Sequence, residues 1–178
     1  MLALLLLGQA VVKPIHMNAT DIAGASYAIP TEAKATVLLF VGVDCPIANR
    51  MAPEISRILR DYKPRSVKTF LVYPDGSLSQ KDVAAHMKSF SLDAIAVIDK
   101  KLALVKATRA SVTPQAIVLD ATGTIRYSGR INDLYEEHGK IKPRPTRNDL
   151  RVALDELLAG KKVSHPTTQL VGCFIAGA

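Results

Sequence analysis

Residues 36–41 form an unbroken apolar run (TVLLFV) that is rich in residues favouring β-structure. This run predicts a strand buried on both faces at the centre of a sheet. Downstream, the apolar positions recur with a helical period, which predicts a helix with one stripe facing the sheet (Ile55, Ile58, Leu59 and Tyr62). Cys45 and Pro46 stand at the junction, and proline suits the first helical position because no backbone N–H is needed there. A cysteine in this place lies in the positive field of the helix N-terminus, which favours the reactive thiolate.

Apolar runs and turn residues predict the other elements. In chain order we expect a hairpin of residues 15–17 and 26–29, the central strand and its helix, a strand at 67–73, a helix capped by Ser79, a strand at 94–98, a short helix within 99–110, a hairpin of residues 115–120 and 124–129, a long loop over 131–147, and a last helix capped by Thr146 and ended by Gly160. His16 and His86 are expected on the surface of their strand and helix.

Two of these segments together resemble the thioredoxin-like superfamily, specifically its redoxin branch of alkyl hydroperoxide reductases and thiol–disulfide oxidoreductases. The first is Cys45-Pro46 at the helix start, with Pro53 eight residues after the cysteine (53 − 45 = 8). The second is Thr113-Pro114 followed by a strand hairpin. The resemblance spans residues 15–160. It implies an α/β thioredoxin-like fold: a central mixed β-sheet flanked by helices on both faces, with an N-terminal β-hairpin extension. It also implies a cis Thr113–Pro114 bond that faces the active cysteine.

The second cysteine of the superfamily's CxxC motif is absent, because position 48 is Ala. The chain has only one other cysteine, Cys173, which lies in the tail beyond the last helix. Two cysteines in an exported chain are natural partners. We therefore expect Cys45 and Cys173 to be able to form a disulfide.

Composition limits the function classes and the organisation of the chain. The net charge is +7, yet the basic residues are scattered and aromatic residues make up only 5%, so nucleic-acid binding is not indicated. Residues 1–12 begin with a short apolar run that is typical of a signal-peptide remnant and too short to span a bilayer. We expect a redoxin domain over residues 13–162, a tail over residues 163–178 that carries Cys173, and a periplasmic or otherwise exported location.

The function that these features favour is that of an exported thiol–disulfide oxidoreductase. Cys45 is the expected nucleophile, and Cys173 is its resolving or structural partner. The resemblance implies that Pro46, Thr113 and Pro114 shape the substrate groove, and we expect Arg130, just past the hairpin, to lie near them. No cofactor is expected, and the partner is a redox protein or a thiol donor.

Two alternatives remain open. A thiol-dependent peroxidase of the peroxiredoxin kind would carry Thr or Ser at position 42, where this chain has Gly, and Asp44 would oppose thiolate formation unless Arg130 offset it. A non-catalytic redoxin-fold module that binds metal would use a CxxxC pair, but position 49 is Asn. His138 or His165 would then have to join a cysteine as ligand, and no metal site is assigned.

Overall fold

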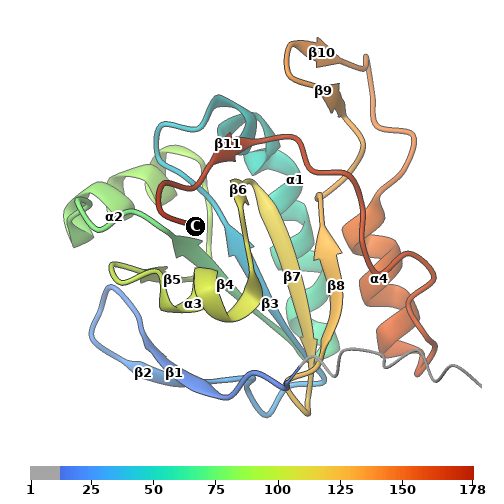
Figure 1. Cartoon of the computed structure of the whole chain (residues 1–178), viewed down its shortest axis with the longest axis horizontal. Coiled ribbons are helices and arrows are strands. Elements are labelled where there is room, and N and C mark those ends of the chain that lie inside the picture. Colours follow the sequence, from blue (N-terminus) through green and yellow to red (C-terminus); the bar gives the residue numbers. More distant parts are fainter. Residues whose placement is uncertain (1–12) are drawn as a thin grey trace, which may run out of the picture.

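The central sheet has five strands in the order β5-β4-β3-β7-β8 (Figure 1). The computed structural model describes residues 13–178, so the expected signal-peptide remnant lies outside the described residues. The strands are β3 (Ala35–Phe40), β4 (Val67–Tyr73), β5 (Ile95–Ile98), β7 (Gln115–Asp120) and β8 (Ile125–Gly129). β3, β4 and β5 run parallel, whereas β7 and β8 are antiparallel to their neighbours. The predicted mixed sheet is confirmed.

β3 is the central strand, and all six of its residues are buried. Leu38 is paired with Phe70 of β4 on one side and with Ile117 of β7 on the other. Side chains alternate between the faces of a strand, so Val37 and Leu39 join one hydrophobic cluster, while Leu38 and Phe40 join another. A strand of this kind must be covered on both faces, as its continuous apolar sequence predicts.

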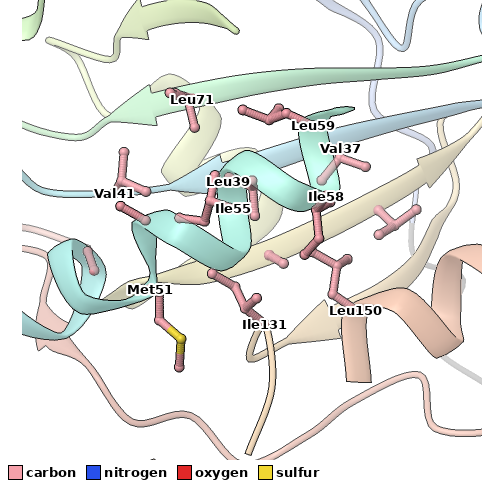
Figure 2. Packing of buried hydrophobic residues seen from close by; sticks show 14 of the residues in the cluster. Val37, Leu39, Val41, Met51, Ile55, Ile58, Leu59, Leu71, Ile131 and Leu150 are labelled. Carbon is pink, nitrogen blue, oxygen red and sulfur yellow. The ribbon is translucent and has the colours of Figure 1, made fainter. Parts of the chain in front are cut away.

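Helices and a hairpin supply that cover. α1 (Pro46–Tyr62), α2 (Gln80–Ser89) and α4 (Asp149–Leu158) bury their apolar residues in the cluster of Val37 and Leu39. Figure 2 shows Ile55 and Ile58 of α1 packed between this sheet face and Leu150 of α4. On the other face lie α3 (Ala103–Thr108) and the hairpin of β1 (Met17–Thr20) and β2 (Ser26–Ile29).

Short elements complete the described chain. They are the 3-10 helix η1 (Lys63–Arg65) and the two-stranded pairs β6 (Val112–Thr113) with β11 (Cys173–Phe174) and β9 (Tyr135–Glu137) with β10 (Lys140–Ile141). The Thr113–Pro114 peptide bond is cis, as the superfamily resemblance predicts, and so is Ile29–Pro30. No helix among residues 13–178 is long and apolar enough to cross a bilayer.

Three local predictions were wrong. The segment 131–147 contains the β9–β10 hairpin, and Asp133 organises it by accepting hydrogen bonds from the backbone amides of Thr146 and Arg147. Because Thr146 is bound to Asp133, it does not cap α4, whose N-cap is Asn148. The third error concerns His86, which is only 6% exposed rather than on the surface.

Candidate active site at Cys45 and Cys173

Cys45 is the N-cap residue of α1, directly after the loop that leaves β3. Its backbone is extended (φ −87°, ψ 106°), and its sulfur accepts a hydrogen bond from the backbone N–H of Ala48 at 3.4 Å. Pro46 takes the first helical position, as predicted. Cys45 is only 4% exposed, so its sulfur is held at the helix N-terminus and largely shielded from solvent.

Cys173 is brought to Cys45 by a strand pairing at the end of the sheet. β11 runs antiparallel to β6, with Cys173 opposite Thr113 and Phe174 opposite Val112. The Cys45 thiol donates to the Thr113 carbonyl oxygen at 3.0 Å, so both cysteines meet at the same residue of β6. Both are free thiols, with Cys45 buried and Cys173 half-buried, and both line the same groove. The structure therefore brings together the two cysteines that the sequence left 128 positions apart (173 − 45).

The two thiols differ in acidity. Burial by itself raises the pKa of Cys45, but hydrogen bonds from the thiol of Cys173, the side-chain hydroxyl of Thr113 and the backbone N–H of Ala48 stabilise its thiolate and together hold the pKa below the usual value for cysteine. Burial raises the pKa of Cys173 to about 11, and the neighbouring Cys45 adds to the shift through a hydrogen bond and charge repulsion. At neutral pH Cys45 is thus the better thiolate and Cys173 stays protonated.

A buried polar network supports the loop before Cys45. Asn49 of α1 donates to the Val43 carbonyl oxygen at 2.8 Å, and its amide oxygen lies 2.9 Å from Nε2 of His86. Nδ1 of His86 lies 3.0 Å from the hydroxyl of Tyr73. Since the Asn49 nitrogen is used by Val43, its oxygen must accept from His86, which places the imidazole proton on Nε2 and leaves Nδ1 to accept from Tyr73. Burial lowers the pKa of His86, although the charge of Asp44 opposes the shift.

The sequence interpretation missed this network. The signal was available in part, because His86 lies three residues after Val83, on the buried stripe of its helix. The partners Asn49 and Tyr73 come from other elements, and their meeting with His86 depends on how α1, α2 and β4 pack together. Pairing of that kind is a tertiary property that a helical period does not encode.

One open groove of about 530 Å³ reaches the sulfur pair. It runs between the loop after β3, the loop after β4 and the tail, and Gly42, Cys45, Thr113 and Cys173 are among its lining residues. Pro46 and Pro114 flank these residues in the chain but are not part of the lining. Of the predicted substrate residues, only Thr113 therefore faces the groove.

Arg130 is not among the residues that line this groove, and its guanidinium has another partner. Its guanidinium is bound to the carboxylate of Asp149 at the start of α4, with Nε 2.7 Å from Oδ2. Asp149 is 3% exposed, so this ion pair compensates a buried charge. Arg130 therefore has a structural partner that its position after the hairpin did not reveal.

The geometry around the candidate histidine ligands offers little to a metal. Within residues 13–178, no three or more His, Cys, Asp or Glu side chains are grouped so that they could hold an ion. His138 and His165 are both exposed, and Nδ1 of His165 pairs with the hydroxyl of Ser164. The thiol pair thus remains the chemically distinctive feature of the site.

Comparisons with known proteins agree with this fold. A family model described as the AhpC/TSA family matches residues 15–128. No curated protein sequence matches the chain. Among solved structures, an uncharacterized conserved protein from Geobacillus kaustophilus is 22% identical with a TM-score of 0.79, and the match covers 92% of this chain and 89% of that one. A hypothetical protein from Sinorhizobium meliloti is 21% identical with a TM-score of 0.76, covering 92% and 91%. A secreted Mycobacterium tuberculosis disulfide oxidoreductase homologous to Escherichia coli DsbE is 17% identical with a TM-score of 0.56, covering 81% and 95%.

Proposed function

The chain belongs to the AhpC/TSA family, and from this premise we propose that it is a thiol–disulfide oxidoreductase in which Cys45 is the nucleophile and Cys173 the resolving cysteine. The observation that carries the proposal is the meeting of two free thiols at Thr113, one at a helix N-terminus with a lowered pKa and the other on a paired strand. A CxxC motif supplies both thiols from one helix turn, whereas here a strand from the tail supplies the second.

The reaction proceeds in two exchanges. The Cys45 thiolate attacks one sulfur of a substrate disulfide, the substrate S–S bond breaks, and one substrate thiolate leaves. Cys173 then attacks the Cys45 sulfur of the mixed disulfide, and the second substrate thiolate leaves with the proton that Cys173 gives up. Two electrons pass from the two cysteines to the substrate, which is released as two thiols, and a Cys45–Cys173 disulfide remains. An external dithiol reduces this disulfide and completes the cycle.

The shifted pKa values suit this order of events. Part of the raised pKa of Cys173 comes from the neighbouring Cys45. Once Cys45 has formed a mixed disulfide it carries no charge, so that repulsion disappears and Cys173 loses its proton more easily. The Cys173 thiol therefore stays protonated, and thus a poor nucleophile, until the first exchange has taken place.

Glutathione disulfide, followed by acid quenching and peptide mass mapping, tests the proposal. We expect the reduced protein to release two glutathiones and to yield a Cys45–Cys173 cross-linked peptide. Cys173→Ser should stop at a Cys45–glutathione mixed disulfide, and Cys45→Ser should form no adduct at position 45 and react slowly at Cys173. A stable Cys45–glutathione adduct in the protein with both cysteines would refute the resolving role, and the absence of a Cys45–glutathione adduct in Cys173→Ser would refute the nucleophile.

We also propose that the chain works in an exported, oxidising compartment. Support comes from the apolar residues of the sequence start, which are typical of a signal peptide, and from a reactive thiol pair that such compartments keep oxidised. Detection of the protein in a periplasmic or secreted fraction, with a processed N-terminus, tests this.

A thiol-dependent peroxidase is the second candidate, favoured by the burial of Cys45 at the end of a groove of small-molecule size. In that reaction the Cys45 thiolate attacks a peroxide oxygen, the O–O bond breaks, and an alcohol or water leaves. The resulting sulfenic acid then condenses with Cys173, with loss of water, to the same disulfide. Peroxide consumption with a dithiol donor, compared with glutathione disulfide turnover in the same preparation, distinguishes the two.

A further inference from the structure

The C-terminal segment 171–178 lies on the edge of β6, beside the sulfur of Cys45. Cys173 and Phe174 pair with Thr113 and Val112, and the N–H of Ile175 donates to the Ser111 carbonyl oxygen at 2.9 Å, which extends the pairing by one residue. Figure 1 shows β11 crossing the end of the sheet above β6, next to the start of α1. The outer backbone edge of residues 111–113 is therefore occupied by the protein's own chain.

Gly172 allows this close approach. A Cβ at position 172 would overlap the Thr113 carbonyl oxygen and lie 2.9 Å from the carbonyl carbon, so any larger residue would push the tail away. Residues on either side hold the tail in place. Val171 is buried in the cluster on the α1 face of the sheet, and Ile175 in the cluster on the opposite face. The tail is thus anchored across both halves of the core rather than resting loosely on the surface.

An extended protein substrate would bind by strand addition at the same edge, since its main chain would have to pair with Thr113 to reach Cys45. The tail already holds that position, and Cys45 is almost fully covered. The remaining access is the groove of about 530 Å³, which is in the range of small-molecule sites. We propose that the tail acts as a built-in substrate strand, which excludes extended protein chains and restricts Cys45 to low-molecular-weight disulfides.

This inference rests on the proposed function and adds the class of substrate. Phe174 fits the same interpretation, because it points away from the core with 85% of its surface exposed while its backbone is paired. The tail therefore covers the edge of β6 through main-chain pairing and through the close approach that Gly172 permits. Burial of the Phe174 ring contributes nothing to this contact.

Gly172→Ala is the variant that tests the proposal, because it adds one methyl group against Thr113 and leaves both anchor residues and both cysteines unsubstituted. The measured quantity is the rate at which the Cys45 thiol is consumed by glutathione disulfide or by insulin, a protein disulfide. We expect the unaltered protein to react with glutathione disulfide much faster than with insulin. In Gly172→Ala the insulin rate should rise at least about tenfold, which corresponds to about 1.4 kcal/mol, while the glutathione disulfide rate changes far less.

Gly160→Ala serves as the matched control. Its backbone has φ +70°, so a side chain there is strained, yet no atom outside its immediate neighbours lies within 4 Å of the added Cβ. It destabilises the protein without touching β6 and should leave the ratio of the two rates unchanged. If Gly172→Ala does not fold, Ile175→Ala loosens the same strand by removing one anchor. Equal insulin rates in the unaltered protein and the loosened variant would overturn the proposal, as would an unaltered protein that reduces insulin as fast as glutathione disulfide.

A second readout separates failure of this inference from failure of the proposed function. Iodoacetamide and a maleimide on a long polyethylene glycol chain label thiols by alkylation, with no redox chemistry, and peptide mapping distinguishes Cys45 from Cys173. The small reagent should label Cys45 at similar rates in both proteins, and the bulky one at least about tenfold faster in Gly172→Ala. Absence of a Cys45–glutathione mixed disulfide in Cys173→Ser would refute the proposed function alone, whereas equal bulky labelling in the unaltered protein and Gly172→Ala would refute the tail as a barrier.

Discussion

Asn49→Ala should destabilise the protein through the buried network beneath the active-site loop. The variant removes two hydrogen bonds, from Asn49 to the Val43 carbonyl oxygen and from His86 to the Asn49 amide oxygen. His86 is buried, so its Nε2–H is left without an acceptor, which costs about 1–3 kcal/mol. The half-buried Val43 carbonyl loses a bond with a net value of about 0.5–1.5 kcal/mol. The expected total is about 3 kcal/mol.

A loss of this size is measurable by thermal or urea unfolding followed by circular dichroism. For a domain of this length each kcal/mol shifts the melting temperature by about 2–4 °C, so Asn49→Ala should lower it by about 6–12 °C. The pKa of Cys45, measured from the pH dependence of its alkylation, should rise as well, because the loop before Cys45 is no longer fixed by the hydrogen bond from Asn49 to the Val43 carbonyl oxygen.

Arg50→Ala is the control, since Arg50 is the next residue of the same helix, is exposed, and makes no side-chain hydrogen bond or ion pair within the described residues. It should change the unfolding free energy by less than about 0.5 kcal/mol. If Asn49→Ala and Arg50→Ala unfold at the same temperature, the network does not hold the loop and the interpretation of Asn49 is refuted.

Three further predictions concern ionisable groups. The folded-state pKa of His86 is lowered from 6.5, so the unfolded chain binds the imidazole proton more readily than the folded protein. The stability that neutral His86 contributes is therefore complete above about pH 6.5, and the free energy of unfolding falls below that pH by at most about 1.4 kcal/mol per pH unit. A free energy of unfolding that stays constant between pH 7 and 5.5 would contradict this. Arg130→Met leaves the buried Asp149 carboxylate short of its main partner and should cost about 3 kcal/mol in urea unfolding, whereas Arg126→Met, at a partly exposed ion pair, should cost less than about 1 kcal/mol; equal costs would argue against a structural role for the first pair. Asp133→Asn should weaken the bonds that organise the segment 131–147 and lower its local opening free energy by about 1.5–3 kcal/mol, seen as faster hydrogen exchange of the two amides that it binds; unchanged exchange would exclude that role.

Much of the fold could be predicted because local sequence patterns specify its helices and strands. The apolar run of β3 and the helical stripe of α1 each specify their own element, and the capping box of Ser79 and Asp82 marks the start of α2 as predicted. The cis bond before Pro114 followed from the superfamily resemblance and is confirmed. These features depend on residues close together in the sequence or on a motif with fixed spacing.

The features that were missed depend on partners far apart in the chain. The ion pair between Arg130, just past the hairpin, and Asp149 of the next helix could not be predicted from the sequence pattern. His86 is a polar residue on a short helix, and its burial is tolerated only because Tyr73 and Asn49 satisfy both ring nitrogens. The burial of a polar side chain can be predicted only when its hydrogen-bond partners are known, and the sequence pattern does not identify those partners.

In the proposed reaction, the position of Cys173 links resolution of the mixed disulfide to substrate access. A cysteine at position 48 would approach the Cys45 sulfur from within the helix, where the small, buried Ala48 now donates its N–H to that sulfur. Cys173 instead approaches through the pairing of β11 with β6, from the side on which an extended substrate would bind. A substrate chain paired with Thr113 would therefore have to displace Cys173 before the mixed disulfide could form. Cys173 could then not attack that disulfide until the substrate chain had left the edge of β6. A small disulfide that enters by the groove avoids this conflict, because Cys173 stays opposite Thr113 throughout both exchanges.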